Sequence, residues 1–174
     1  MVHFSVFGGH EGQLSAGGCV YITLFGGSEL KRPPLAARLA ALRRPSGLRD
    51  EPRYVFLSLF GSTTIRWPTL AEEFLALTDA LRAGAFTLDD WERFTASPGE
   101  HRLLRAGSFT LFGSMQTDAL PTEEEELDGL SLQRHAGTIA DAAVERLMLA
   151  VGQGGAQRLA SVRQAVAASL PRPA

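Results

Sequence analysis

Large apolar and small polar side chains alternate in four short segments of this chain. The segments read "VHFSVFGG", "VYITLFGG", "VFLSLFGS" and "GSFTLFGS", and they begin at residues 2, 20, 55 and 107. Alternation with a period of two is typical of a β-strand whose two faces meet different surroundings. The pattern therefore predicts four strands, each of which ends at an aromatic residue followed by glycine.

The four segments agree column by column when they are aligned on that aromatic residue. A small hydroxyl stands two positions before it, and large apolar residues stand one and three positions before it. The hydroxyl column is Ser5, Thr23, Ser58 and Thr110, and the apolar columns are Val6, Leu24, Leu59 and Leu111 with Phe4, Ile22, Leu57 and Phe109. We expect the apolar columns to face a core and the hydroxyl column to face away from it. The corner phenylalanines share the parity of the hydroxyls, so they need cover from one another, from a helix or from a partner.

The aromatic-glycine pairs are the candidate structural corners of the fold. They are Phe7, Gly8, Phe25, Gly26, Phe60, Gly61, Phe112 and Gly113. Glycine suits a sharp corner because it adopts positive φ and lets a neighbouring backbone pass close by. A phosphate-binding loop would need its glycines at the start of a helix, with a lysine or a longer glycine fingerprint. No corner has that context, so we interpret the glycines as structural.

A short extended segment follows each corner and ends near proline in three of the four cases: "SELKRPP", "STTIRWP" and "SMQTDALP". The predicted unit is therefore a strand, a glycine corner, a second strand and a return. The corner phenylalanines are 18, 35 and 52 residues apart, and we attribute the longer returns to helices inserted at about 33–44 and 69–96. The second insertion has Thr69 and Glu72 at the spacing of a capping box.

The sequence changes character after residue 121. Thr122 precedes the acidic run Glu123 to Glu126, which favours the start of a helix, although such a run could also bind a cation or a basic partner. Further helices are predicted over 138–151 and 156–170, joined at "GQGG". One face of the last helix is the candidate interaction surface, formed by Leu159, Val162, Val166 and Leu170. It would either pack back onto the strands or recruit a partner or a second copy.

These elements together predict an α+β fold. Residues 1–121 would form a four-repeat stacked β framework, either β-solenoid-like or a compact β-sandwich, and residues 122–174 would form a C-terminal helical segment. A chain of 174 residues can bury a core of this kind.

Composition narrows the function classes. A net charge of -2 argues against nucleic acid as a partner. The single cysteine, Cys19, favours the cytoplasm. The first residues lack the pattern of a signal peptide, and no apolar window approaches the ~20 residues that would insert into a membrane.

The residues that could perform chemistry are sparse. His3, His10, His101 and His135 show no metal-ligand spacing, and no nucleophile, P-loop or dinucleotide motif occurs. His10 and Glu11 could form a metal or acid/base pair, but we favour a solvated turn at this place. We therefore predict no catalytic residue, no metal and no cofactor.

The repeated corners and the short strands after them resemble the C-terminal domain of the cell-wall-active-antibiotics-response proteins, the LiaF/YvqF-like family of bacteria. The resemblance covers residues 2–14, 20–34, 55–68 and 108–121. It implies a β-solenoid-like or compact all-β stack and a regulatory role in envelope-stress signalling through protein contacts. Members of that family usually carry transmembrane helices ahead of this domain, whereas this sequence starts at its first strand.

The sequence thus predicts a non-enzymatic scaffold or regulatory protein that acts through protein–protein association, including homo-oligomer formation. Two alternatives stay open. One is a filament-forming, β-solenoid-like cytoskeletal protein that polymerises through its strand edges. The other is an enzyme or small-ligand binder with a pocket between helices and strands.

Overall fold

The computed structural model describes residues 1–15, 18–42, 53–96 and 105–170. Within these residues the fold is α+β, with two parallel four-stranded sheets and six helices. The predicted α+β class is thereby confirmed.

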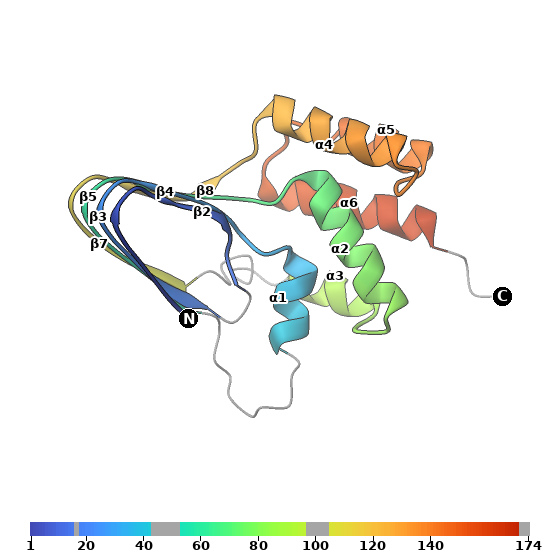
Figure 1. Cartoon of the computed structure of the whole chain (residues 1–174). Coiled ribbons are helices and arrows are strands. Elements are labelled where there is room, and N and C mark those ends of the chain that lie inside the picture. Colours follow the sequence, from blue (N-terminus) through green and yellow to red (C-terminus); the bar gives the residue numbers. More distant parts are fainter. Residues whose placement is uncertain (16–17, 43–52, 97–104, 171–174) are drawn as a thin grey trace. The chain divides into compact units, whose positions relative to one another are not determined.

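The first sheet contains the four predicted strands (Figure 1). It is formed by β1 (Val2–Phe7), β3 (Cys19–Phe25), β5 (Arg53–Phe60) and β7 (Arg105–Phe112), in that order. Neighbouring strands pair in the register of the sequence alignment, so that Phe7 lies opposite Phe25, Phe25 opposite Phe60, and Phe60 opposite Phe112.

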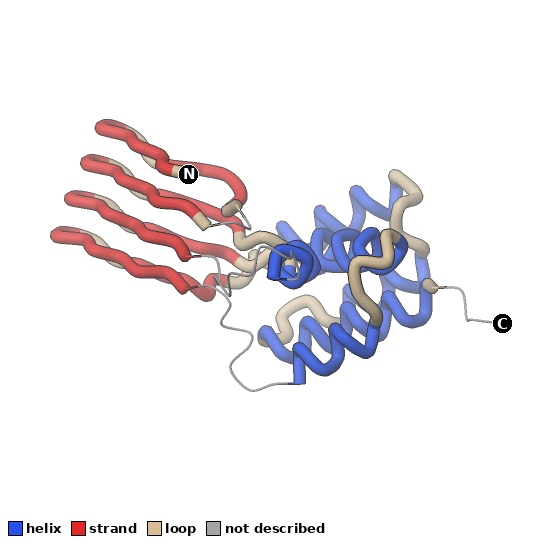
Figure 2. The backbone as a smooth tube through the Cα atoms, turned by 90° about the horizontal axis from the view of Figure 1, so that it is seen from below, coloured by secondary structure: helices blue, strands red, loops and turns tan. Residues whose placement is uncertain are grey.

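The second sheet contains the short strands that follow the corners. They are β2 (His10–Gln13), β4 (Ser28–Lys31), β6 (Thr63–Arg66) and β8 (Met115–Ala119), again in parallel and in chain order. Figure 2 shows the strands lying side by side, with short turns at one end. The register shifts once, between Thr64 and Arg66, because β8 carries an irregularity there.

The helices are α1 (Leu35–Leu42), α2 (Leu70–Arg82), α3 (Leu88–Ala96), α4 (Glu123–His135), α5 (Asp141–Met148) and α6 (Gly155–Ser169). Both predicted helix starts are confirmed, because Thr69 with Glu72 and Thr122 with Glu125 form capping boxes. Each insertion therefore lies where the sequence predicted it.

The chain divides into two compact units, here called the strand unit and the helical unit. The strand unit comprises residues 1–33, 37–68 and 101–120, and the helical unit comprises residues 34–36, 69–100 and 121–174. This division differs from the expected boundary at residue 121, because α2 and α3 belong with the C-terminal helices. The reason is the apolar face of α2, where Leu70, Phe74 and Leu77 are buried in contacts with α4 and α6.

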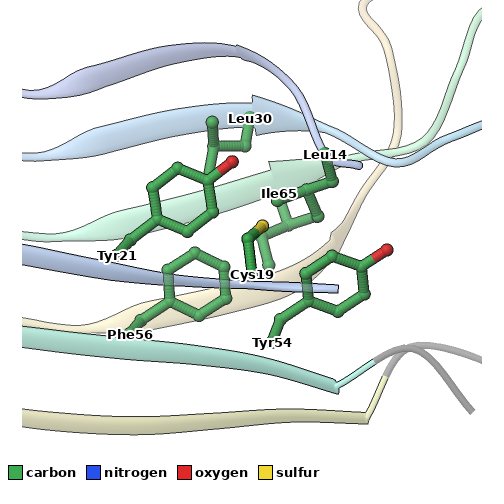
Figure 3. Packing of buried hydrophobic residues seen from close by; sticks show 7 residues of the cluster. All are labelled: Leu14, Cys19, Tyr21, Leu30, Tyr54, Phe56 and Ile65. Carbon is green, nitrogen blue, oxygen red and sulfur yellow. The ribbon is translucent and has the colours of Figure 1, made fainter. Parts of the chain in front are cut away.

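The core of the strand unit lies between its two sheets (Figure 3). The first sheet contributes two tyrosines, a phenylalanine and the free cysteine, and the second contributes aliphatic side chains. The cluster consists of Leu14, Cys19, Tyr21, Leu30, Tyr54, Phe56 and Ile65, with Met115 packed against it.

The predicted facing of the first sheet is wrong. Thr23 and Ser58 are buried, at 3% and 8% exposure, in the same inward column as the core aromatics. The apolar residues between them point outward, and Leu57 is 38% exposed and Phe109 62%.

The glycine corners explain this reversal. Each corner turns the chain from one sheet to the other within two or three residues, so the sheets are close together there and only small side chains fit between them (Figure 1). Ser58 and Thr23 occupy this narrow end, while Phe56 and Tyr21 lie one inward position farther from the corner. The alternation is a true strand signal, but the volume at the corner decides which column is inside.

A candidate interaction surface on the first sheet

The outward column of the first sheet is apolar from the corners as far as Val55 and Gly107, and the next pair of positions in that column is Arg53 and Arg105. We call the apolar part of this column the apolar sheet face. It consists of Val2, Phe4, Val6, Val20, Ile22, Leu24, Val55, Leu57, Leu59, Gly107, Phe109 and Leu111. Most of the large side chains on the two outer strands are well exposed, with Val2 at 66%, Phe4 at 63%, Phe109 at 62% and Leu111 at 54%. Scattered apolar residues on a surface are ordinary, whereas a continuous block of them marks an interaction site.

The corner phenylalanines form an aromatic row at the end of the first sheet, on the parity of the hydroxyl column. Their rings stack in sequence, with centroids 5.4 Å apart for Phe7 and Phe25, 5.4 Å for Phe25 and Phe60, and 5.0 Å for Phe60 and Phe112. The two inner rings are 43% and 45% exposed, and the terminal rings Phe7 and Phe112 are 79% and 63% exposed. The phenylalanines therefore cover one another but still present an aromatic edge to the outside.

The outward face of the second sheet is different in kind. It carries Glu11, Glu29, Gln116 and Asp118 as exposed side chains, and the Glu29 carboxylate bonds to Arg66 at 2.6 Å. Both sheets are built from the same units, yet one outward face is charged and the other is mainly apolar. The contrast makes the apolar sheet face the candidate interaction surface of the strand unit.

Three of the four corner glycines lie too close to a neighbouring backbone to carry a side chain. Gly26, Gly61 and Gly113 have φ of 125°, 149° and 154°, and a Cβ on them would lie 2.7, 2.1 and 1.8 Å from the backbone of the corner before. Gly8 has φ of 97°, but a Cβ there would meet nothing within 4 Å. The backbone amides bond to the next corner, as Gly26 N does to Phe60 O at 2.9 Å. The glycines thus set the spacing between corners.

The predicted interaction helix is used inside the helical unit. Leu159, Val162 and Val166 are at most 4% exposed, and Leu170 is half-buried. Helix α6 contacts α2, α3 and α5, all in the same unit. Its apolar face is therefore occupied and does not offer a free docking surface.

Two buried glutamates connect the helices, and the sequence analysis did not single them out. The Glu73 carboxylate accepts a hydrogen bond from Leu35 N at the start of α1, at 3.0 Å. The Glu126 carboxylate accepts one from Leu70 N at the start of α2, at 2.8 Å, and forms a buried salt bridge with Arg158. Part of the acidic run is thus explained by helix packing.

A repeated signal in the sequence could have revealed these glutamates. The segments "PPLAAR", "PTLAEE" and "PTEEEE" begin at residues 33, 68 and 121, and each leads from the second sheet into a helix. Glu73 and Glu126 occupy the last position of the second and third segments. The internal repeat therefore continues beyond the strands into the first turn of each helix.

Tyr54 and Arg32 are polar residues in the strand unit whose buried groups have structural partners. Tyr54 Oη donates a hydrogen bond to Ser15 O at 2.7 Å, and burial, assisted by Cys19, raises the pKa of Tyr54 to about 12. The Arg32 guanidinium lies 4.5 Å from the centre of the Trp67 ring and pairs with Asp118. Burial lowers the pKa of Arg32, although Asp118 opposes that shift. We interpret the side chains of Tyr54 and Arg32 as structural groups that stabilise the packing of the strand unit.

Two of the hollows among the described residues lie beside candidate chemical residues. A groove of about 770 Å³ lies between α4 and α5, where Arg134 bonds to Asp141 at 2.8 Å. A smaller hollow of about 380 Å³ adjoins β1 and β2, where the rings of His3 and His10 lie 5.8 Å apart.

The other candidate chemical residues do not assemble a site. His135 bonds to Ser131 O on its own helix, at 2.8 Å, and His101 lies outside the described residues. In the described part of the chain, no three His, Cys, Asp or Glu side chains gather closely enough to hold a metal ion. Within the same ranges, no helix has the length and apolarity required to cross a membrane.

Comparison of the chain with protein-family models, with curated proteins and with solved structures found no match. The functional argument therefore depends on the geometry of the chain itself.

Proposed function

We propose that this protein is a non-enzymatic scaffold or regulatory module that acts through protein–protein association, and that the apolar sheet face is its docking surface. The observation that supports this function is the block of exposed apolar side chains on that face, which extends from the corners to the paired positions of Arg53 and Arg105. An exposed surface of this composition in water is stabilised when another apolar surface covers it.

We further propose that the two sheets form a β-solenoid-like framework whose job is to hold this face rigid and flat. The in-register parallel pairing in both sheets supports that interpretation. The regulatory role in envelope stress, acting from the cytoplasm, is supported by the resemblance of the corners and by the lone Cys19, and it is proposed on that basis.

Site-specific photo-cross-linking in the native host tests the function. A photoreactive amino acid at position 57, in the apolar sheet face, should give adducts of protein mass. The same group at position 116, on the charged face of the second sheet, is the matched control and should give few. Equal adducts at both positions, or none at 57 in a folded chain, would contradict the proposed docking surface.

Filament formation is a second candidate, favoured by the edges of the sheets. Among the described residues, β1 and β7 each pair with a strand on one side, so their outer edges have unused backbone groups. Head-to-tail addition of copies through two different edges generates an open polymer.

Gly8 provides a selective test of the filament. Its Cβ would meet nothing in a single chain, but the corresponding Cβ at Gly26, Gly61 and Gly113 points at the backbone of the corner before. Gly8→Ala should therefore leave a folded chain and block the approach of a preceding copy. Electron microscopy distinguishes the outcomes. Filaments that persist in Gly8→Ala would exclude this mode of assembly. If the parent chain forms only discrete particles, filament formation is excluded altogether.

A further inference from the structure

We propose that a divalent transition-metal ion of the zinc class binds between the imidazoles of His3 and His10. These residues belong to β1 and β2, which are end strands of the two sheets and are here called the first layer. The two imidazoles supply two ligands, and water completes the coordination of the ion. This inference goes beyond the proposed function and does not depend on the apolar sheet face.

The first corner brings the two histidines together. His3 lies four residues before Phe7 and His10 lies three residues after it, so the turn places them near each other in different sheets. Their ring centres are 5.8 Å apart. Zinc binds an imidazole nitrogen at about 2.1 Å, so two rings that share one ion have centres about 5–6 Å apart. The separation of the two rings therefore suits a shared ion.

The pair offers a ligand atom and room for an ion. His10 Nε2 is buried and has no hydrogen-bond partner among the residues that the structure describes. Burying a polar atom without a partner is unfavourable, and coordination to a metal ion would use the lone pair of this nitrogen. Both rings line a hollow of about 380 Å³ together with Glu11 and Gln13. Since a water molecule takes up about 30 Å³, this hollow has space for an ion and its waters.

Packing alone explains His3 but not the pair. The His3 ring stacks on Tyr21 with centres 4.7 Å apart, and Tyr21 stacks on Phe56 with centres 5.2 Å apart. His3 thus continues an aromatic column of the core, which a phenyl ring would do equally well. A second imidazole with an unpaired buried nitrogen adds nothing to that column, and a shared ion accounts for it.

The corresponding positions in the other layers hold different residues. Gly12 stands where Leu30 and Ile65 fill the core in the next two layers, and a Cβ on Gly12 would meet nothing within 4 Å. The first layer therefore has space that its neighbours lack. The positions of the two histidines are occupied in the other layers by Tyr21 with Ser28, Phe56 with Thr63, and Ser108 with Met115.

The chemistry of the pair selects the class of metal. Imidazole nitrogen suits zinc, nickel and copper, whereas magnesium and calcium prefer oxygen ligands. Across the described ranges, no third His, Cys, Asp or Glu side chain joins the two histidines. Structural zinc sites have four protein ligands, so we expect this ion to exchange with the solution.

Calorimetric titration of the full, metal-free chain with zinc chloride tests the site. The parent chain should bind one zinc ion at micromolar concentrations, and magnesium chloride should give no binding. His3→Phe keeps a ring on Tyr21 and removes the nitrogens, and His10→Phe makes the same change in β2. Each variant should weaken zinc binding at least about 10-fold. His135→Phe, on α4, is the matched control and should bind zinc like the parent chain.

Proton NMR of the imidazole rings provides a second measurement that needs no variant to bind zinc. The chain has four histidines, and the single substitutions assign their ring resonances. Zinc should shift the resonances of both His3 and His10 in the parent chain and leave those of His135 unchanged. A shift confined to one ring of the pair would overturn the inference, even if one of the variants fails to fold.

Each calorimetric outcome also has a definite meaning. Weaker binding in both His3→Phe and His10→Phe, with parent-like binding in His135→Phe, supports the shared site. A parent chain that binds no zinc, or binding that is unchanged in both variants, overturns it. Binding lost only in His3→Phe would place the ion on His3 and neighbouring main-chain nitrogens. Binding lost only in His135→Phe would place it on α4, and either result overturns the inference.

Discussion

Replacing the four corner glycines by alanine, one at a time, should produce a graded loss of stability. The gradient follows from how close each new Cβ would lie to the corner before it. That distance is beyond 4 Å at Gly8, 2.7 Å at Gly26, 2.1 Å at Gly61 and 1.8 Å at Gly113. Real Cβ contacts essentially never fall under 3.0 Å, so three of the four substitutions require the backbone to move.

Two costs combine in this series. Alanine at these positive φ angles costs about 1–3 kcal/mol by itself, which is the whole effect expected for Gly8→Ala. Gly61→Ala must also push the neighbouring corner away by about 1 Å, which strains the hydrogen bond between Gly26 N and Phe60 O. Crowding of that size costs a further 1–3 kcal/mol or so, plus about 1 kcal/mol for the weakened bond. The difference between Gly61→Ala and Gly8→Ala should therefore be about 2–4 kcal/mol.

Thermal unfolding followed by tryptophan fluorescence measures the gradient. Trp67 lies in the strand unit and Trp91 in the helical unit, so a Trp91→Phe background reports on the strand unit alone. With about 2–4 °C of Tm per kcal/mol for a chain of this size, Gly61→Ala should melt roughly 10 °C below Gly8→Ala. Equal losses at Gly8 and Gly61 would refute the idea that contact between neighbouring corners sets their geometry.

Three further changes test other parts of the structure. Ser58→Asp should unfold the strand unit, because an unpaired carboxylate would be buried at a cost of several kcal/mol. Leu57→Asp should leave the chain folded, because that position faces outward. Circular dichroism distinguishes the two variants. Glu126→Gln should destabilise the helical unit by about 3 kcal/mol in urea unfolding, because it removes the carboxylate that balances the charge of buried Arg158. Tyr54→Phe should reduce the loss of stability between pH 10 and about 12. The folded pKa of Tyr54 is raised to about 12. The stabilisation by neutral Tyr54 is therefore complete below its unfolded pKa of about 10 and is lost as pH rises through the folded value.

The controls for these three changes lie on the same elements. If Ser58→Asp and Leu57→Asp behave alike, the facing of β5 described here is wrong. Glu124→Gln alters an exposed neighbour of Glu126 on α4 and should cost well under 1 kcal/mol. If it costs as much as Glu126→Gln, the buried salt bridge is not the cause of the loss of stability. An unchanged alkaline profile in Tyr54→Phe would show that another group governs unfolding in that range.

The strands and their register could be predicted from the sequence because the corners repeat. Phe7, Phe25, Phe60 and Phe112 define the alignment, and parallel strands of one repeating unit pair in that same alignment. The helices followed from capping boxes and prolines, which act locally and are visible in a few residues.

The facing of the first sheet could not be predicted from alternation alone. Alternation with a period of two shows that the two faces of a strand differ. The usual assumption then places the column of larger apolar residues inside. Here the narrow space at each corner admits Ser58 or Thr23 but not Leu57, so the smaller column is inside and the apolar one remains exposed. The candidate interaction surface was therefore missed for the same reason that the facing was wrong.

The buried glutamates also affect the order in which the helices can fold during synthesis of the chain. The first amide of α1 bonds to Glu73, which lies 38 residues later, and the first amide of α2 bonds to Glu126, which lies 56 residues later. During synthesis, each of these helices emerges before the carboxylate that completes its start. We therefore expect α1 to be finished only after α2 has been translated, and α2 only after α4. Nascent chains that end before residue 126 should leave α2 accessible to proteases, so assembly of the helical unit proceeds backward along the sequence.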